Sequence, residues 1–210
     1  MKNILCFGDS NTWGYNPRTK ERFSSDIRWT GVLQKNLGND VKIIEEGLCG
    51  RTTVYEDETR PDRKGIDSIP GIFERNERID AVIIMLGTND CKRINHTTPR
   101  DIAMGIDSCL DVILKQIPSD KVLLVSPINL GDDVWKDEYD PEFDKKSVLV
   151  SRQLKQEYRK VAKKRGVYFL AASDYVAPSK ADQEHLDEEG HRVFADAITG
   201  YITGINRMCA

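Results

Sequence analysis

The segment Asn3-Ile4-Leu5-Cys6-Phe7-Gly8-Asp9-Ser10 is an apolar run that ends abruptly in a glycine and two polar residues. Four further apolar runs follow it along the chain, at residues 41–44, 81–86, 122–125 and 167–171. These runs are nearly continuous, rich in β-branched or aromatic residues, and each ends near Gly, Ser or Pro. That pattern is typical of parallel strands that are buried on both faces of a sheet.

Segments with helical periodicity fill the gaps between these runs. The apolar spacing predicts helices within residues 29–37, 102–117, 148–165 and 188–202, the first stopped by Gly38, the second by Pro118 and the last capped by Asp187. Alternation of strands and helices predicts an α/β fold, a three-layer αβα sandwich around a five-stranded parallel sheet. No linker or repeat divides the chain, so residues 1–210 are interpreted as one domain.

Two segments do not fit the alternation, residues 15–28 and residues 128–144. The second is acidic and aromatic, with Trp135, Tyr139 and Phe143 among several carboxylates. Loops of this length are either functional lids or tolerated surface insertions, and the sequence leaves both alternatives open.

The composition is that of a folded chain, with 39% hydrophobic and 31% charged residues and a net charge of −3. There is no basic stripe, which argues against a nucleic-acid partner. No segment approaches the length of a membrane span or of a signal peptide, so we expect a cytoplasmic protein without a membrane partner. The cysteines are odd in number and form no CxxC pair, which indicates reduced, mostly structural thiols; they are Cys6, Cys49, Cys91, Cys109 and Cys209.

Residues that carry chemistry follow the strands. Ser10 comes after the first strand, Gly47 after the second, Asn89 after the third, and the pair Asp182 and His185 after the fifth. Because ligands of parallel α/β sheets bind beyond the carboxyl ends of the strands, these residues are expected to meet at one edge. They would supply a nucleophile, a base with its orienting carboxylate, and donors for an oxyanion.

Ser10 needs a base, and His185 is the preferred one because Asp182 lies three residues before it. On this pair alone, a loop aspartate beside a helix-entry histidine is the simpler interpretation. His191 lies beside Arg192 in the last helix and is interpreted as a surface residue, and His96 as a loop residue that lines the pocket in a minority alternative.

The predicted oxyanion donors are the Ser10 amide, the Gly47 amide and the Asn89 side chain. The alternatives are that Gly47 only makes a turn and that Asn89 only caps one. The three histidines show no H-x-H or H-E-x-x-H spacing, so no metal and no cofactor are expected.

The blocks together resemble the SGNH (GDSL-type) serine hydrolase family, whose motifs are a Gly-Asp-Ser, a glycine after the second strand, a Gly-x-Asn-Asp and an Asp-x-x-His. Here they read Gly8-Asp9-Ser10, Gly47, Gly87-Thr88-Asn89-Asp90 and Asp182-Gln183-Glu184-His185. Further stretches, among them Thr12-Trp13-Gly14 and Arg51-Thr52-Thr53, are similar to the bacterial arylesterase/acyltransferase branch.

The resemblance implies a flavodoxin-like sheet of order 2-1-3-4-5, no metal, and a homo-oligomer. It also implies a serine esterase that acts on small-molecule esters through an acyl-enzyme and transfers acyl groups to alcohols. Related enzymes deacetylate carbohydrates, so a carbohydrate acetylesterase with the same triad is an alternative. A flavodoxin-like binding module is the alternative outside the enzymes.

Two residues depart from the family pattern. Asn11 stands where the name-giving motif has Leu, and Glu184 stands where the branch tends to have an apolar residue. With the bulky Trp13 nearby, these residues are predicted to contact the substrate. Their polarity favours short, acetyl-type esters of a polar alcohol over greasy aryl esters.

Overall fold

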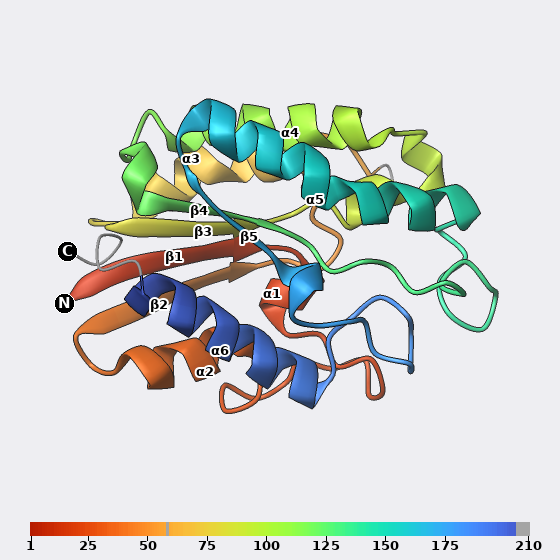
Figure 1. Cartoon of the computed structure of the whole chain (residues 1–210), viewed down its shortest axis with the longest axis horizontal. Coiled ribbons are helices and arrows are strands. Elements are labelled where there is room, and N and C mark those ends of the chain that lie inside the picture. The colour runs from red at the N-terminus through yellow and green to blue at the C-terminus, as the bar shows by residue number, and fades with distance from the viewer. Residues whose placement is uncertain (58, 205–210) are drawn as a thin grey trace.

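The computed structural model describes residues 1–57 and 59–204, which form one five-stranded sheet with helices on both faces (Figure 1). The strand order is β2-β1-β3-β4-β5, and every pair of neighbours is parallel. The strands are β1 (Lys2–Gly8), β2 (Val41–Gly47), β3 (Ala81–Met85), β4 (Val122–Ser126) and β5 (Tyr168–Ala171). The predicted α/β class and sheet order are therefore confirmed.

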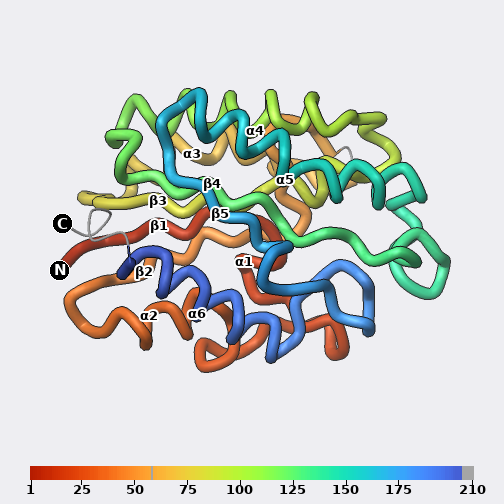
Figure 2. The backbone as a smooth tube through the Cα atoms, in the orientation of Figure 1, coloured from red at the N-terminus to blue at the C-terminus, as the bar shows by residue number. Residues whose placement is uncertain are grey.

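The register brings the carboxyl ends of the central strands level. Gly8 at the end of β1 is paired with Gly47 on β2 and with Met85 on β3. Consequently the residues that follow these strands start from one edge of the sheet. Figure 2 shows the long connections after β1, β4 and β5 extending from that same side.

Helices cover both faces of the sheet (Figure 1). Helices α2 (Trp29–Leu37) and α6 (Glu188–Gly204) pack together on the first face. On the second face lie α3 (Gly65–Arg75), α4 (Pro99–Ile113) and α5 (Lys145–Arg165). Each face has its own cluster of buried apolar side chains, as expected for strands that are apolar on both sides.

The chemistry of the helix ends explains where these helices begin and stop. Thr98 caps α4 with Pro99 at its first position, and Asp144 caps α5 in a reciprocal bond with Ser147. Helix α5 ends in a basic turn followed by a left-handed Gly166. Asp187 accepts a hydrogen bond from the Gly190 amide at 2.9 Å, as predicted for the start of α6.

Helix α3 was not predicted from the sequence. It contains Gly65, Pro70 and Gly71, which are poor helix formers, so its propensity is low. The helix forms because Ile69 and Ile72 are fully buried in the core, which shows tertiary packing overriding local preference. Helix α4 also ends at Ile113, earlier than the predicted stop at Pro118.

The prediction that His191 lies on the surface is wrong. Its side chain is fully buried between α6 and α2, where Nδ1 accepts a hydrogen bond from the Trp29 amide at 3.3 Å. Its ring meets Phe23 edge-on at 5.3 Å. Burial, together with the charge of His185, lowers the pKa of His191 to about 3, so this histidine is neutral in the folded protein.

The structure also locates the thiols and the apolar segments. Cys6, Cys91 and Cys109 are buried and Cys49 is partly exposed, all as free thiols, while Cys209 lies outside the described residues. Within residues 1–57 and 59–204, no helix is long and apolar enough to cross a membrane.

Replacement of His191 by Asn is expected to make folding stability less sensitive to acid. A histidine in the unfolded chain titrates near pH 6.5, so below that pH His191 is protonated in the unfolded chain. In the folded chain it stays neutral, because its pKa is lowered to about 3. Wild-type stability therefore falls as the pH drops from about 6.5 towards 3. Urea unfolding at pH 7 and pH 5 should show a loss that is smaller in His191→Asn by up to about 2 kcal/mol.

The control is His96→Asn, because the His96 side chain is exposed. That variant should lose as much stability as the wild type between the two pH values. An equal loss in His191→Asn and wild type would contradict the buried, neutral state assigned to His191.

Candidate active site

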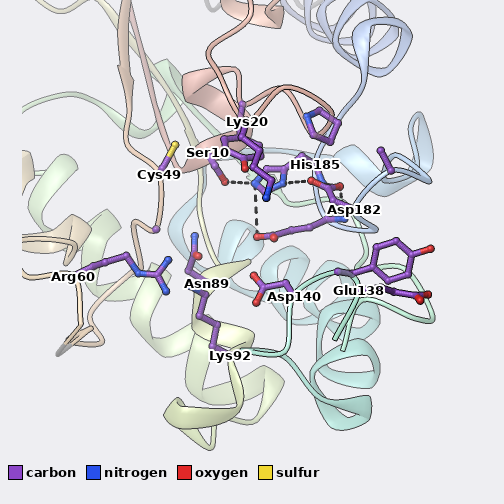
Figure 3. A pocket seen from close by; sticks show the side chains of 16 residues that line it. Ser10, Lys20, Cys49, Arg60, Asn89, Lys92, Glu138, Asp140, Asp182 and His185 are labelled. Carbon is purple, nitrogen blue, oxygen red and sulfur yellow. Dashed lines mark hydrogen bonds and ion pairs between the residues drawn. The ribbon is translucent and has the colours of Figure 1, made fainter. Parts of the chain in front are cut away.

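Ser10 is the first residue of α1 (Ser10–Trp13), a single turn that follows β1 directly. Asp9 caps this turn by accepting a hydrogen bond from the Asn11 amide at 3.0 Å. The sharp change from strand to helix holds Ser10 at the sheet edge, with only 3% of its surface exposed. Its hydroxyl faces a cavity between the loops (Figure 3).

The loop before α6 brings Asp182 and His185 to Ser10, as Figure 3 shows. The Ser10 hydroxyl lies 2.8 Å from His185 Nε2, and His185 Nδ1 lies 2.6 Å from Asp182 Oδ2. The other Asp182 oxygen accepts hydrogen bonds from the backbone amides of Glu184 and His185, at 3.1 and 3.0 Å. One carboxylate thus orients both the imidazole ring and the backbone that carries it.

Asn11 does not line the cavity, contrary to the position predicted for it. Its side chain is buried and points to the histidine loop, where Oδ1 accepts from the Leu186 amide at 2.9 Å and Nδ2 donates to the Glu184 carbonyl at 3.5 Å. A leucine could form neither bond. Asn11 therefore joins the serine turn to the histidine loop.

Trp13 does not line the cavity either. Its ring lies under the Arg22 guanidinium at 5.5 Å and next to the Tyr15 ring at 6.5 Å. Tyr15, which sequence reasoning missed, lines the cavity and packs against His185, with ring centroids 4.4 Å apart and the rings tilted by 39°. Its position two residues after a predicted contact residue was the only available signal.

The structure places two of the three predicted oxyanion donors at the cavity and the third away from it. Ser10 and Asn89 both line the cavity, but Gly47 does not. A Cβ on Gly47 would lie 2.1 Å from the Trp13 nitrogen, so a glycine is needed there for the α1 backbone to pack on β2. Gly50, three residues later and left-handed with φ +81°, lines the cavity instead.

The floor of the site is a set of buried polar contacts. Asn89 Nδ2 donates to the Arg51 carbonyl at 3.1 Å, and the Arg51 guanidinium donates to the Gly8 carbonyl at 2.9 Å. Asp90 is buried, and its carboxylate accepts hydrogen bonds from the Thr53 amide and hydroxyl. Burial raises the pKa of Asp90 to about 6, against the lowering effect of the Thr53 bonds.

The cavity has a volume of about 280 Å³ and is lined by residues from five separate segments. Both segments left unassigned by the sequence contribute: residues 15–28 supply Tyr15, Pro17 and Lys20, and residues 128–144 supply Glu138, Tyr139 and Asp140. Their place over the site favours the lid alternative over a surface insertion. His96 is exposed and lies outside the cavity lining.

The cavity walls carry charges of both signs (Figure 3). Lys92, only 5% exposed, and Arg60 both pair with Glu142, behind the cavity lining. Asp140 and Glu184 face the same space. The sequence did not single out Arg60, Lys92 or Asp140, because each stands in a loop without periodicity.

Glu184 lines the cavity as predicted, and its carboxyl lies 3.8 Å from His185 Nε2. Burial raises the pKa of Glu184 above its usual value. Burial alone would lower the pKa of His185, but the Glu184 and Asp182 carboxylates raise it further than burial lowers it. The imidazole is therefore a stronger base than a free histidine.

Serine, histidine and aspartate in this geometry can remove a proton from the serine hydroxyl and stabilise the resulting imidazolium. The described residues hold no cluster of three or more His, Cys, Asp or Glu side chains that could bind a metal ion. The site therefore has the means for nucleophilic attack on a carbonyl compound.

Comparisons with known proteins agree with this chemistry. A sequence model of the GDSL-like lipase/acylhydrolase family matches residues 6–193. The solved structure of an aryl esterase from M. smegmatis is 35% identical with a TM-score of 0.89, covering 98% of this chain and 100% of the other. A carbohydrate acetylesterase from Sinorhizobium meliloti is 33% identical with a TM-score of 0.89 and the same coverage.

A lipase/acylhydrolase from Enterococcus faecalis, at 19% identity and a TM-score of 0.71 over 97% of this chain and 96% of the other, shares the fold. The comparison with curated proteins found no match. The family model spans nearly the whole chain and includes the serine and histidine blocks. The chain therefore belongs to the GDSL-like lipase/acylhydrolase family and is a carboxylic ester hydrolase.

Proposed function

We propose that the protein hydrolyses short-chain, acetyl-type esters through an acyl-enzyme on Ser10. The observation that carries this proposal is the continuous hydrogen-bond chain from Ser10 through His185 to Asp182, with contacts of 2.8 and 2.6 Å. A binding module would have no use for a buried histidine held in this way between a hydroxyl and a carboxylate.

In the first half of the reaction, His185 Nε2 takes the Ser10 proton while Oγ attacks the ester carbonyl. Asp182 stabilises the imidazolium, which then gives its proton to the leaving alcohol as the carbon–oxygen bond breaks. In the second half, water gives a proton to His185 and attacks the acyl-enzyme, and His185 returns that proton to Ser10 Oγ as the bond to the acyl group breaks and the acid leaves. An alcohol in place of water would yield a new ester, the acyl transfer that we include in the proposal.

The oxyanion formed in both halves needs fixed donors. The Ser10 amide and the Asn89 side chain are two of them, since Asn89 Nδ2 carries two protons and donates only one to Arg51. For the third we propose the Gly50 amide in place of the predicted Gly47 amide. Gly50 borders the cavity beside Ser10, whereas Gly47 lies beneath the α1 turn.

The size and polarity of the cavity support short acyl groups. The space is about 280 Å³, and its walls include Arg60, Lys92, Asp140 and Glu184. A long alkyl chain would have to lie against these charged groups, which is unfavourable. The same polarity favours carbohydrate acetylesterase activity as the second candidate, in line with the name of the Sinorhizobium meliloti protein.

Replacement of Ser10 by Ala tests the nucleophile. The variant should lose esterase turnover by at least about a thousandfold, because the hydroxyl forms the acyl bond. Its thermal unfolding should stay close to wild type, since only one oxygen atom is removed from the turn. Turnover of phenyl acetate and the melting temperature measure the two effects. A well-folded Ser10→Ala protein with half of the wild-type activity would refute the assignment.

The pH dependence of kcat/KM tests the base. His185 must be neutral in the free enzyme, so kcat/KM should rise with pH through its pKa. Since the neighbouring carboxylates raise that pKa, the rise should be centred above the usual value of about 6.5. Asp182→Asn removes a negative charge, so it should lower turnover and move the rise to lower pH. A rise at the same pH in both proteins would exclude His185 as the titrating group.

A further inference from the structure

Glu184 is a buried carboxyl group that the catalytic scheme leaves unused. The residue is 6% exposed, and its backbone is fixed on both sides, by Asp182 at its amide and by Asn11 at its carbonyl. Burial leaves the side chain little freedom, and it lines the same cavity as Ser10.

Within residues 1–57 and 59–204, no hydrogen bond reaches the Glu184 carboxyl. Its Oε1 lies 3.8 Å from His185 Nε2, which is an ion-pair distance rather than a hydrogen bond. The Glu184 oxygens are not among the fully enclosed side-chain atoms without a partner, so they are open to the cavity. An accessible polar group of this kind binds a water or a ligand. Since this one faces the substrate cavity, a substrate atom is the natural partner.

The position of His185 Nε2 indicates which half of an ester would supply that atom. This nitrogen must pass its proton to the oxygen of the leaving alcohol, so that oxygen comes within hydrogen-bond distance of it. Glu184 Oε1 lies 3.8 Å from the same nitrogen, whereas Asn89 and Gly50, which also line the cavity, would hold the carbonyl oxygen as the proposed oxyanion donors. The carboxyl therefore borders the alcohol half of the ester.

We propose that the Glu184 carboxyl binds a second hydroxyl group on the alcohol half of the ester, so that the preferred substrates are acylated diols and sugars. This proposal rests on the proposed function, since it uses Ser10 and His185 in the roles given above. A vicinal diol places its second oxygen one carbon further from the scissile bond, beside the group that protonates the first.

The charges around Glu184 favour a hydroxyl over a cation. Lys92, just after the 3-10 turn Asn89–Cys91, and His185, next to Glu184 in its own loop, already supply positive charge near the carboxyl. Asp182 and Asp140 face it with negative charge, and burial raises the pKa of Glu184, which keeps a share of the carboxyl protonated. A protonated carboxyl both donates and accepts, which matches a hydroxyl, and it lacks the negative charge that would attract an ammonium group.

The test compares kcat/KM for 2-hydroxyethyl acetate with that for n-propyl acetate, two esters of similar size that differ in one hydroxyl. The wild type should prefer the hydroxyethyl ester by roughly 10-fold, the value of one hydrogen bond to a charged or polar buried group. Glu184→Leu should abolish this preference, and Glu184→Gln, whose amide still forms hydrogen bonds, should keep part of it. Because both esters use the same base, the ratio within each protein cancels any change in the pKa of His185.

The control is Glu188→Gln, an exposed carboxylate in the first turn of α6, outside the cavity lining, which should leave the ratio unchanged. A wild-type ratio near one, or the same ratio in Glu184→Leu, would overturn the proposal. So would a preference for acetylcholine that Glu184→Gln removes, because it would make the carboxylate a cation site.

Phenyl acetate separates this proposal from the proposed function. If the wild type hydrolyses phenyl acetate and Ser10→Ala does not, the serine mechanism is supported whatever the ratio of the two alkyl esters shows. If Glu184→Leu does not fold, the wild-type ratio and Glu184→Gln decide.

Discussion

The site depends on one hydrogen bond between residues 175 positions apart, from Ser10 to His185. The local structure around either residue does not fix the length of this bond, because the serine follows the first strand and the histidine precedes the last helix. Asn11 supplies the connection: its side chain holds the backbone on both sides of His185, at Glu184 and Leu186. A buried amide with both ends engaged fixes distance and orientation together, which a leucine at this position could not do.

Beneath this bond the sheet edge is packed backbone against backbone. Gly47 lets the α1 turn lie directly on β2, and the Arg51 guanidinium ties the loop after β2 to the Gly8 carbonyl at the end of β1. The same guanidinium lies 4.4 Å above the Phe7 ring. Asn89 then bonds to the Arg51 carbonyl, so the oxyanion side of the cavity is held by the same loop that supports the nucleophile.

Much of the fold and of the site could be predicted from the sequence, and the features that could not be predicted have physical reasons. Strands buried on both faces have continuous apolar sequences, so the sheet and its carboxyl edge could be predicted. Ser10, Asn89, Asp182 and His185 follow these strands and could be placed at that edge. The direction of a side chain beside the site leaves no such trace, which is why Asn11 was misplaced. Gly47 ends β2 and Gly50 follows three residues later, and the sequence alone does not show that α1 packs against Gly47. His191 carried a usable signal, since it falls in helical register with the buried Phe194, Ala195, Ile198 and Ile202.

The most direct test of the central claim is the site and stoichiometry of labelling by a fluorophosphonate, which reacts with a serine that a neighbouring base has activated. Mass spectrometry of the intact protein and of its peptides should find one adduct per chain, on Ser10, formed more slowly in Asn11→Leu and not at all in His185→Ala. The Asn11→Leu variant tests the Asn11 hydrogen bonds that position His185, and the His185→Ala variant tests the base itself. An adduct on another residue, or equal labelling of Ser10 in His185→Ala, would contradict the account.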